Sequence, residues 1–573
     1  MKSLETDVIV IGGGATGSGV LRDAAMRGYR AILVERVDLG QGTTGRFHGL
    51  LHSGGRYVVT DPRSATECAQ ETAILSKIAA DAVEQTGGLF VTTPADDPEY
   101  ADKFAAACLA TDVPVQEIAV AEALRREPRL NPKISRAFAV NDGSVDAWKL
   151  IWGNVHSAME YGAQVLTYHW VTQVLRDGDR VCGVVCRDDV HGGEVRIDAD
   201  FVINAGGVWA GQIADMAGCP DVQVVPGRGV MIAMNHRLVN TVVNRCDPPG
   251  DGDIIVPIHT VCVIGTTDTK VDSPDDLPIP RDEVQQMLDA GEVLVPGFRQ
   301  SRALHAWAGA RPLVKDTRVA ADDTRHMSRG MAAFDHLERD GVRGFLTISG
   351  GKATTFRLMA QVVVDQMCEQ RGDTRPCRTG DEVMPTAREG RNYTVGHRLA
   401  DREGDRLDDP LICECELVTR SMLENAARGN PTITLDDLRR DVRLGMGPCQ
   451  GGFCTYRAVG IVHEMSKAGV WEGDAGHQTQ AAEDWHVAHL QSVKHNVANE
   501  TGPTAGSNGK GATVAPPALF EPNLLLRDFL QERWKGVTPI LWGRQLKQER
   551  RRAHLSGPCL LYTSPSPRDG LLS

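Results

Sequence analysis

Residues 7–36, DVIVIGGGATGSGVLRDAAMRGYRAILVER, constrain the fold more than any other stretch of the chain. A short apolar run predicts a buried parallel strand, and a glycine-rich turn, a helical pattern and a second strand follow it. Gly12 allows a tight turn, Gly14 lets a pyrophosphate approach the backbone, and Gly17 lets the helix pack on the strand. Glu35, at the end of the second strand, can accept a hydrogen bond from a ribose. Together these parts predict a dinucleotide-binding fold; the alternative is an ordinary glycine-rich turn.

The composition is that of a globular protein with several domains. The chain has 573 residues, more than one hydrophobic core usually supports, so about two to four domains are expected. Its formal net charge of -13, with no sustained basic face, argues against nucleic acid as a partner. Residues 1–11 lack the pattern of a signal peptide, and no run of about 18 apolar residues occurs. Fourteen cysteines in this length are not the density of a disulfide scaffold, so we expect the reducing cytosol.

Two later segments have the pattern expected where the chain re-enters the same nucleotide-binding unit. Residues 199–210, ADFVINAGGVWA, and 344–360, GFLTISGGKATTFRLMA, are each a strand followed by a glycine turn, at Gly206 and at Gly350 and Gly351. About 130 residues with alternating strand patterns lie between them. This layout resembles the FAD-dependent oxidoreductases related to glycine and D-amino-acid oxidases, which favours FAD over NAD. The expected fold class is α/β (α+β overall), a Rossmann-like FAD-binding domain interrupted by a mixed-sheet substrate domain.

Several motifs, in order along the chain, closely resemble the FAD-dependent glycerol-3-phosphate dehydrogenases. They are GQGTTGRFHGLLHSGGRYVVTD at 40–61, DGSVDAWKL at 142–150, GARPLV at 309–314, SRG at 328–330 and GGKATTFRLMA at 350–360. The likeness extends from about residue 7 to about residue 555. With a C-terminal cysteine module, it indicates the anaerobic branch of the family. The resemblance implies that Thr43 and Thr44 contact FAD, together with Glu35 and the glycines named above.

Oxidation of a phosphorylated secondary alcohol by a flavin needs a hydride acceptor, a base for the hydroxyl proton and fixed cations. The family motifs supply six candidate side chains: His52, Arg56, Arg311, Arg329, Lys352 and Arg357. The resemblance implies that Arg56 and Lys352 contact the substrate phosphate or its polar groups, with Arg329 and Arg357 as further substrate contacts. It implies that Arg311 partners the oxygen at the reacting carbon, with Lys352 also in the catalytic set.

His52 is the candidate base, and one departure from the family pattern leaves that role open. Aerobic relatives tend to carry a histidine after the segment that corresponds to VVPGRG, residues 224–229. Val230 and Met231 stand there instead in this chain. Taken singly, each of the candidate side chains is more often a surface cation or a histidine with a structural hydrogen bond. Their occurrence together in the family motifs favours the functional interpretation.

Four cysteines form two pairs near the C-terminus: Cys413, Cys415, Cys449 and Cys454. A disulfide framework, a zinc site and buried thiols are the alternatives to an iron–sulfur cluster. The C-x-C spacing is tighter than structural zinc sites usually use. Glycines at 445, 447, 451 and 452 would let backbone N–H groups approach the sulfurs, which favours a [2Fe-2S] cluster. The motif resembles the bacterioferritin-associated-ferredoxin-like (BFD-like) domain, so a small helical [2Fe-2S] domain is expected, with zinc as the weaker alternative.

These motifs predict the division of the chain into domains. The expected units are an FAD-dependent oxidoreductase unit over 1–377, a linker over 378–410, a BFD-like domain over 411–470, a disordered linker over 471–518, a helical segment over 519–556 and a non-native-looking tail over 557–573. Within the first unit we assign the nucleotide part to about 1–80, 145–215 and 340–377. The substrate part is assigned mainly to 81–144 and 216–339.

The resemblance implies oxidation of sn-glycerol 3-phosphate to dihydroxyacetone phosphate. Electrons would pass through the iron–sulfur centre and partner subunits B and C to the quinone pool, at the cytoplasmic face of the inner membrane. The sequence does not decide whether the complex also holds FMN. One alternative is a component of an amine or opine dehydrogenase, whose carboxylate substrate would need fewer cations. Another is a non-catalytic FAD and iron–sulfur electron-transfer protein, which would have no need of the cationic set.

Overall fold

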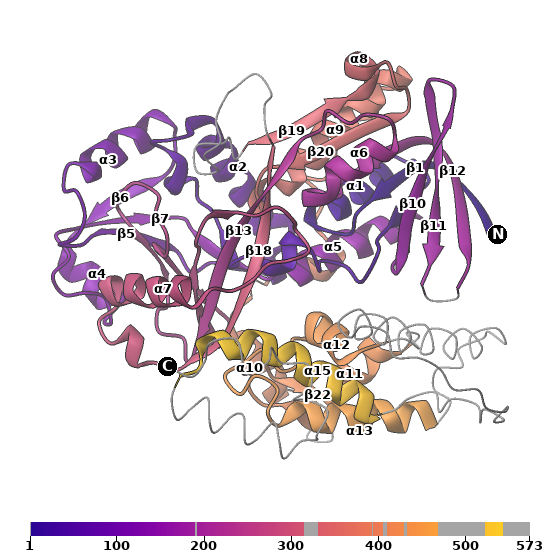
Figure 1. Ribbon diagram of the computed structural model, residues 1–573. Helices are drawn as coiled ribbons and strands as arrows, with labels where there is room; N and C mark the ends of the chain where they lie inside the picture. The colour runs from indigo at the N-terminus through magenta and orange to yellow at the C-terminus, as the bar shows by residue number, and fades with distance from the viewer. Residues whose placement is uncertain are drawn as a thin grey trace, which may run out of the picture.

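The computed structural model describes residues 2–189, 192–314, 330–391, 393–404, 409–428, 433–467 and 522–542. Two large sheets lie side by side, and a small helical module lies against one side of both (Figure 1). The first sheet belongs to a nucleotide unit and the second to a substrate unit. The expected disordered linker, 471–518, and the tail, 557–573, lie outside the described residues.

The nucleotide sheet is built from three separate segments of the chain. In spatial order its path is β10 (His169–Asp177), β11 (Arg180–Asp188), β12 (Glu194–Asn204), β1 (Lys2–Ile11), β2 (Ala31–Val34) and β9 (Gln164–Leu166). β20 (Phe345–Gly350) pairs in parallel with β12, which itself pairs in parallel with β1. The buried apolar runs of these strands match the pattern of a parallel sheet covered on both faces. The expected Rossmann-like fold with two returns is confirmed.

Three helices pack on this sheet and share one core: α1 (Ala15–Met26), α5 (Ala147–Glu160) and α9 (Phe356–Arg371). Their contact surfaces are alanine, valine and methionine side chains, which let the helices approach the strands closely. β19 (Met331–Asp335) pairs with β20 in the same sheet. The nucleotide unit therefore resumes at β19, before the predicted boundary at about residue 340. β19 precedes β20 in the chain and already pairs with it in the nucleotide sheet.

The substrate unit is a mixed sheet around one long antiparallel pair, β13 (Val224–Met234) and β18 (Ala303–Val314). The path from β13 continues through β16 (Val261–Gly265), β15 (Ile254–Ile258), β14 (Val242–Arg245), β5 (Gly88–Thr92), β7 (Arg136–Val140) and β6 (Val115–Ile118), with β17 (Thr269–Lys270) on the other side. α7 (Arg281–Leu294) packs Val284, Met287 and Leu288 against this sheet. A third, small sheet joins β3 (Leu50–Leu51), β8 (Gly143–Val145) and β4 (Val83–Glu84).

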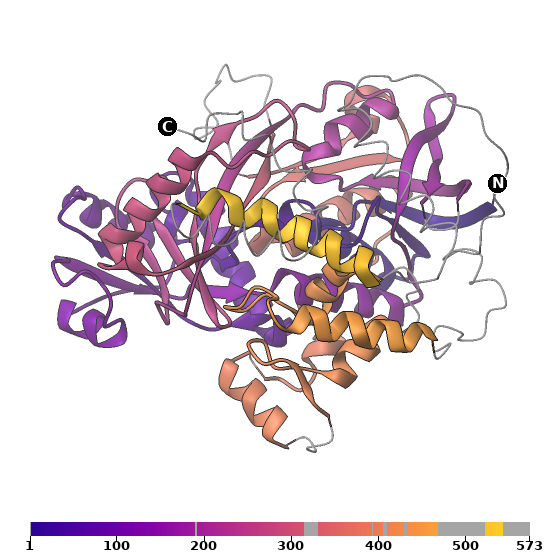
Figure 2. The same ribbon diagram turned by 60° about the horizontal axis from the view of Figure 1, so that its bottom comes forward.

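The cysteine-containing module has its own core and lies across the two larger units (Figure 2). Its elements are β21 (Leu411–Cys413), β22 (Val418–Thr419), α11 (Arg420–Ala427), α12 (Leu435–Val442) and α13 (Cys454–Lys467). α15 (Pro522–Val537) contacts α13 and α12 on one side and β18 on the other, so it links the module to the substrate sheet. Part of the expected linker is also ordered, as α10 (Val395–Gly404).

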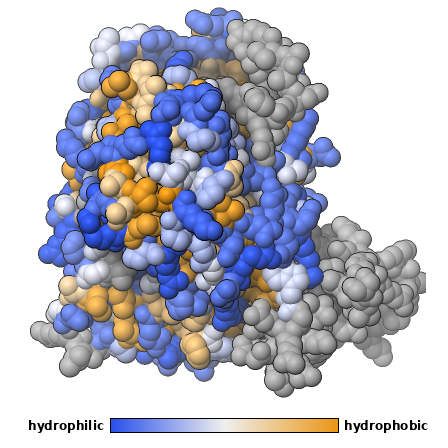
Figure 3. All heavy atoms as spheres, turned by 90° about the vertical axis from the view of Figure 1, so that its left-hand side faces the viewer, coloured by the Kyte–Doolittle hydropathy of each residue, from blue (hydrophilic) through white to orange (hydrophobic). Residues whose placement is uncertain are grey.

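The outer end of the substrate unit, around α3 (Tyr100–Ala110), α4 (Val120–Arg126) and α7, has a mainly hydrophilic surface with small hydrophobic groups among it (Figure 3). Leu109 is the most exposed large apolar side chain there. Single apolar residues of this kind are normal on a globular surface. Among the described helices, none has both the length and the apolar character needed to cross a membrane.

Candidate functional site

The glycine-rich turn after β1 brings three backbones into close contact. A Cβ atom on Gly17 would lie 1.8 Å from the carbonyl oxygen of Gly12, and one on Gly12 would lie 2.6 Å from that of Ala205. Gly12 also has a φ of +110°, so glycine is required there on both counts. Gly14 precedes α1, whose first N–H, on Ala15, donates to Thr44 Oγ1 at 3.1 Å. The start of α1 therefore faces the turn with no bulky side chain between, as phosphate binding requires.

Glu35 is held at the end of β2 by two backbone donors. Its Oε2 accepts from Gly13 N–H at 2.7 Å and its Oε1 accepts from Val37 N–H at 3.1 Å. Burial raises the pKa of this carboxyl group, and the two backbone hydrogen bonds oppose the rise. The carboxylate is thus fixed beside the glycine turn, where a nucleotide ribose is expected.

One cavity of about 490 Å³ contains nearly all of the residues that the sequence assigned to FAD. They are Gly12, Gly14, Glu35, Thr43, Thr44, Gly206, Gly350 and Gly351. Gly17 packs beneath the turn rather than lining the cavity. A long cavity walled by glycine backbone at one end and by polar side chains at the other fits an extended dinucleotide.

The other end of the same cavity is cationic. Arg56 Nη1 pairs with Asp253 Oδ2 at 2.7 Å. Burial lowers the pKa of Arg56, but Asp253, together with Tyr57 and Tyr100, raises it overall. Arg311 Nη1 donates to Asp268 Oδ1 at 3.1 Å, and Nη2 donates to the Thr267 carbonyl at 3.0 Å. Both guanidinium groups line the cavity, and each is oriented by a carboxylate from behind. Arginine in such a setting is suited to hold an anion.

Lys352 enters the cavity from the turn that follows β20. Gly350 and Gly351 have φ values of +81° and +66°, so the chain reverses sharply just before the lysine. The Lys352 ammonium lies 4.4 Å from the centre of the Tyr57 ring, a cation–π contact. The phenol oxygen of Tyr57 is 3.5 Å from His52 Nε2. Lys352 and His52, which are 300 residues apart in sequence, thus share one aromatic neighbour.

His48, which the sequence does not mark as a site residue, also lines this cavity. Its Nδ1 accepts from the N–H of Leu50 at 3.1 Å, so the neutral ring carries its proton on Nε2. Burial lowers the pKa of His48 to about 3, with repulsion from Arg56 and Arg311 adding to the effect. The ring centres of His48 and His52 are 6.1 Å apart. The signal in the sequence was its place in FHGLLH, the motif that also supplies His52.

Arg357, one of the proposed substrate arginines, is paired away from this cavity. Arg357 is not among the residues that line the cavity; its Nε donates to Glu71 Oε2 at 2.8 Å, and it also contacts Gln361 and Thr379. A buried arginine paired in this way serves the packing of α9 against α2 (Pro62–Ile78). We therefore assign Arg357 to this packing rather than to the substrate. Arg329 lies outside the described residues.

The four cysteines of the two pairs come together at one edge of the helical module. Cys454 interacts with both Cys413 and Cys449, and Cys449 interacts with Cys415. The contact with Cys454 lowers the pKa of Cys413 to about 7 and that of Cys449 to about 5. Burial raises the pKa of Cys415 to about 11, and the contacts with Cys413 and Cys449 raise that of Cys454, so the four thiols share their protons as one closely coupled group. None of the four forms a disulfide.

Glycine makes this sulfur cluster compact. Gly445 and Gly451 have φ values of +73° and +81°, and a Cβ atom on Gly447 would lie 2.3 Å from the Cβ of Cys415. The loop between Gly445 and Cys454 can therefore fold tightly around the sulfurs, with its N–H groups close to them. Four thiolates in such a loop fit an iron–sulfur cluster.

Comparisons with known proteins agree with both sites. The family "FAD dependent oxidoreductase" matches residues 7–357, and the "BFD-like [2Fe-2S] binding domain" matches residues 411–464. The chain is therefore an FAD-dependent oxidoreductase with a [2Fe-2S] domain, and FAD and the [2Fe-2S] cluster are its cofactors.

Relatives that align over nearly the full length of the chain identify the family more narrowly. The chain is 39% identical to the A subunit of the anaerobic glycerol-3-phosphate dehydrogenase of Escherichia coli (strain K12), over 95% of each chain. It is 40% identical to the A1 subunit of the corresponding Haloferax volcanii enzyme, over 94% of this chain and 88% of that one. The chain belongs to the family formed by the A subunits of anaerobic glycerol-3-phosphate dehydrogenases.

Solved structures show the same fold at lower identity. The glycerol-3-phosphate dehydrogenase from Bacillus halodurans complexed with FAD has a TM-score of 0.57 and 19% identity, and the alignment covers 94% of this chain and 96% of that one. Glycine oxidase from Geobacillus kaustophilus has a TM-score of 0.52 and 23% identity, over 67% of this chain and 99% of that one. The expected kinship with the glycine oxidase fold is confirmed.

The thiolate ligand assignment can be tested with Cys415→Ser. Serine replaces a soft thiolate with a hard, weakly acidic oxygen, so the cluster should be lost or strongly altered while FAD stays bound in its separate core. We expect iron content and the reduced-state electron paramagnetic resonance (EPR) signal to fall, with the flavin absorbance unchanged. Cys182→Ser, in a half-buried cysteine of β11, is the control and should retain iron. Full iron content in Cys415→Ser would contradict the assignment.

Proposed function

We propose that the chain oxidises sn-glycerol 3-phosphate to dihydroxyacetone phosphate with FAD as the hydride acceptor. The observation that carries the proposal is a single cavity that joins the nucleotide cradle to Arg56, Arg311 and Lys352. A phosphorylated substrate needs such fixed cations, and a scaffold protein has no use for them. The names of the nearly full-length relatives support the same substrate.

Each side chain at the cationic end has a distinct task in this proposal. Arg56 and Lys352 hold the phosphate, and Arg311 contacts the oxygen at the reacting carbon. His52 takes the hydroxyl proton as the alcohol becomes a ketone, and its contact with Tyr57 orients the ring. The bound flavin supplies the acceptor for the hydride that leaves the carbinol carbon. Asp253 and Asp268 hold their arginines in place before substrate arrives.

His48 has a different role from His52 in the same proposal. Its Nδ1 is already an acceptor for a backbone N–H, and its pKa is lowered to about 3. It therefore presents a neutral Nε2–H group over the whole working range of pH, and it is suited to donate a hydrogen bond rather than to take a proton. This assignment leaves His52 as the base.

The electrons leave, in this proposal, through the [2Fe-2S] cluster to partner subunits B and C and then to the quinone pool. The relatives are named as one component of a larger dehydrogenase, which supports the existence of partner subunits. Phe453 and Tyr456, beside the ligand Cys454, are 69% and 53% exposed, which supports a partner surface at the cluster. The chain would then work at the cytoplasmic face of the inner membrane, attached through those partners.

Flavin bleaching under anaerobic conditions tests the substrate directly. Glycerol 3-phosphate should bleach the flavin of the purified chain, because its phosphate matches the cationic end of the cavity. Glycerol should be a very poor reductant, since it leaves Arg56 and Lys352 without an anion. An amine or opine that bleached the flavin as fast as glycerol 3-phosphate would favour the alternative dehydrogenase.

Arg56→Ala should weaken apparent affinity for glycerol 3-phosphate by about 2 to 4 kcal/mol, because one charge-assisted contact to a buried anion is lost. The concentration dependence of flavin bleaching gives the value. Arg245→Ala is a matched control: Arg245, at the end of β14 in the substrate sheet, pairs with Asp96 and does not line the cavity. An equal loss of affinity in both variants would mean that the effect comes from the fold of the sheet.

His52→Asn should slow flavin reduction by about 100-fold or more, because general base catalysis is removed. His48→Phe should slow it only about tenfold, the value of one hydrogen bond, and should leave the pH dependence of the rate unchanged. Stopped-flow measurement of flavin reduction across pH 5 to 9 separates the two roles. Loss of the pH dependence in His48→Phe, with retention in His52→Asn, would reverse the assignment.

A further inference from the structure

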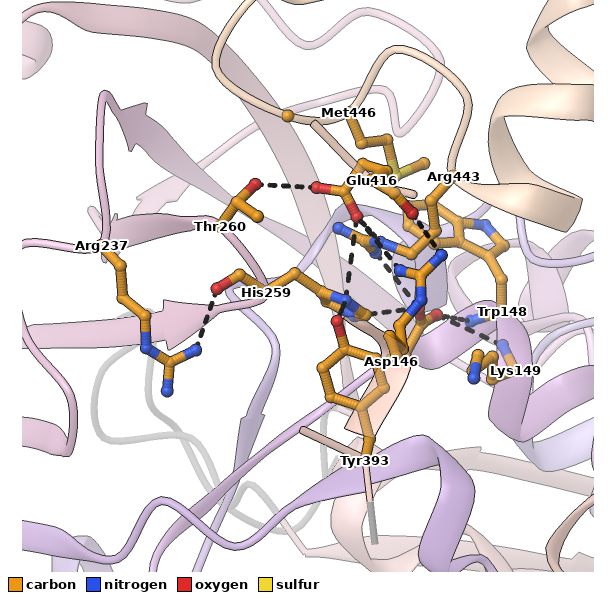
Figure 4. Close-up of polar contacts among 12 residues, drawn as sticks. Asp146, Trp148, Lys149, Arg237, His259, Thr260, Tyr393, Glu416, Arg443 and Met446 are labelled. Carbon is orange, nitrogen blue, oxygen red and sulfur yellow. Dashed lines mark hydrogen bonds and ion pairs between the residues drawn. The ribbon is translucent and has the colours of Figure 1, made fainter. Parts of the chain in front are cut away.

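A buried group of charged side chains joins the cluster module to the FAD-binding part of the chain (Figure 4). We call Asp146, His259, Glu416 and Arg443 the junction network. Glu416 and Arg443 come from the cluster module, and Asp146 and His259 come from the oxidoreductase unit. No member is more than 6% exposed. Charges removed from water in this way are tolerated only when their partners are well placed.

Arg443 is the centre of the junction network. Its Nε donates to Glu416 Oε2 at 2.9 Å, and its Nη1 donates to Asp146 Oδ2 at 3.1 Å. One guanidinium therefore bridges two carboxylates from different parts of the chain. His259 Nε2 lies 3.3 Å from the same Asp146 oxygen, and Thr260 Oγ1 donates to Glu416 Oε1 at 2.9 Å. Arg443 of the module thus donates to Asp146 of the oxidoreductase unit, and Thr260 of the oxidoreductase unit donates to Glu416 of the module.

The junction network lies directly against the cluster loop. Glu416 follows the ligand Cys415 in sequence. A Cβ atom on Gly447 would lie 2.3 Å from the Cβ of Cys415 and 3.3 Å from both Glu416 Oε1 and Thr260 Oγ1. Arg443, at the end of α12, has a φ of +64°, an unfavourable conformation for a non-glycine residue. Its side-chain ion pairs lie beside the loop that carries Cys449.

On the oxidoreductase side, Asp146 leads straight to the substrate cavity. It directly follows β8, which pairs with β3, and β3 lies between His48 and His52 in sequence. The Val145 N–H donates to the Gly49 carbonyl at 2.8 Å in the same stretch. The carboxylate that anchors Arg443 is therefore only one short sheet away from both histidines of the site.

His259 and Thr260 lead to the cavity by a second route. They form the turn between β15 and β16, and β16 ends at Gly265. A Cβ atom on Gly265 would lie 3.2 Å from the Cβ of His48. The two threonines after Gly265 accept hydrogen bonds from Arg311. Asp146 is thus linked to the substrate site through the pairing of β8 with β3, and His259 through β16.

Three further contacts connect α12 to the nucleotide side of the chain. They are Arg440 Nε to Asp38 Oδ2 at 2.7 Å, Trp152 Nε1 to Asp441 Oδ1 at 3.0 Å, and Tyr168 to Asp437 Oδ1 at 3.3 Å. These contacts hold the helix on the surface, and they keep the module attached when the junction network is altered. The junction network differs from them because it adjoins a cluster ligand.

We propose that Glu416, Arg443, Asp146 and His259 are positioning residues for electron transfer: they hold the Cys415 side of the [2Fe-2S] cluster toward the flavin cavity. The inference rests on the proposed function. Oxidation of one alcohol sends a hydride, carrying two electrons, to the flavin and one proton to the base. The two electrons then cross singly to the cluster and on to an added one-electron acceptor, ferricyanide. The junction network sets the rate of that crossing without touching substrate.

The residues on either side of Cys415 provide a matched test. Glu416 has a side chain that is 0% exposed, whereas Glu414 is 57% exposed and pairs with Arg457 at 2.5 Å on the outer side. Glu416→Gln and Glu414→Gln remove the same charge at the same sequence distance from the ligand. Glu416→Gln should slow cluster reduction about tenfold or more, because it breaks a buried, hydrogen-bonded charge pair. Glu414→Gln should leave that rate unchanged.

The measurement separates reduction of the flavin by substrate from electron transfer between the flavin and the cluster. Glycerol 3-phosphate is mixed anaerobically with the full chain, flavin bleaching is followed optically, and cluster reduction is followed by freeze-quench EPR. Iron content and the rate of flavin bleaching should be the same in wild type, Glu416→Gln and Glu414→Gln. Arg443→Met should behave like Glu416→Gln, and Arg443→Lys should be intermediate because it keeps the charge but not the bidentate geometry.

Two results would overturn the inference. One is an unchanged rate of cluster reduction in Glu416→Gln and Arg443→Met with iron retained. The other is loss of iron from Arg443→Met. Arg443 lies six residues before the nearest ligand, Cys449, so this loss would mean that the network builds the cluster site rather than orients it. Photochemical reduction of the flavin without substrate repeats the comparison. A wild-type chain that transfers electrons after illumination but not with glycerol 3-phosphate would contradict the proposed function and leave the junction network supported.

Discussion

The contact between Gly17 and Gly12 is the constraint on which the rest of the site depends. There α1 meets the end of β1 so closely that one added Cβ would lie 1.8 Å from a carbonyl oxygen. The carbonyl of Ala205, after β12, closes the same contact from the next strand. Since β1, β12 and β20 come from three distant segments, their alignment brings the turns at Gly206 and Gly350 to one cavity. The nucleotide cradle, and the position of Lys352 after β20, are consequences of that alignment.

Two arginines that line the cavity are each paired with a carboxylate. Arg56 and Arg311 each keep one carboxylate partner, Asp253 and Asp268, and still line the cavity. A buried arginine without a partner would be costly, whereas one that is paired from behind is oriented before substrate arrives. The same rule separates Arg357 from this group. Its pairing with Glu71, away from the cavity, makes it part of the packing between two helices.

The short segment around Cys415 gives its two glutamates opposite environments. Glu414 faces outward and pairs with Arg457 at the surface, while Glu416 faces inward and joins a network of buried charges. The cluster therefore has one side against the oxidoreductase unit and another beside exposed aromatic residues. Tyr393, in the region expected as a linker before the module, packs against His259 at a ring-centre distance of 4.0 Å.

The sequence by itself determined the nucleotide fold, the FAD and cluster cofactors, and most of the cavity. The glycine turn, Glu35 and the two cysteine pairs are local patterns, and their spacing carries their chemistry wherever the chain places them. Only the tertiary structure decided the partners of individual charges. Nothing near Arg357 in sequence indicates Glu71, 286 positions away. Nothing near His48 indicates that burial, with Arg56 and Arg311 adding to it, suppresses its protonation. Glu414 and Glu416 are identical in sequence terms, and folding buried one and exposed the other. The role of a charged side chain depends on burial and on oppositely charged neighbours, and those are supplied by residues that the chain brings together only when it folds.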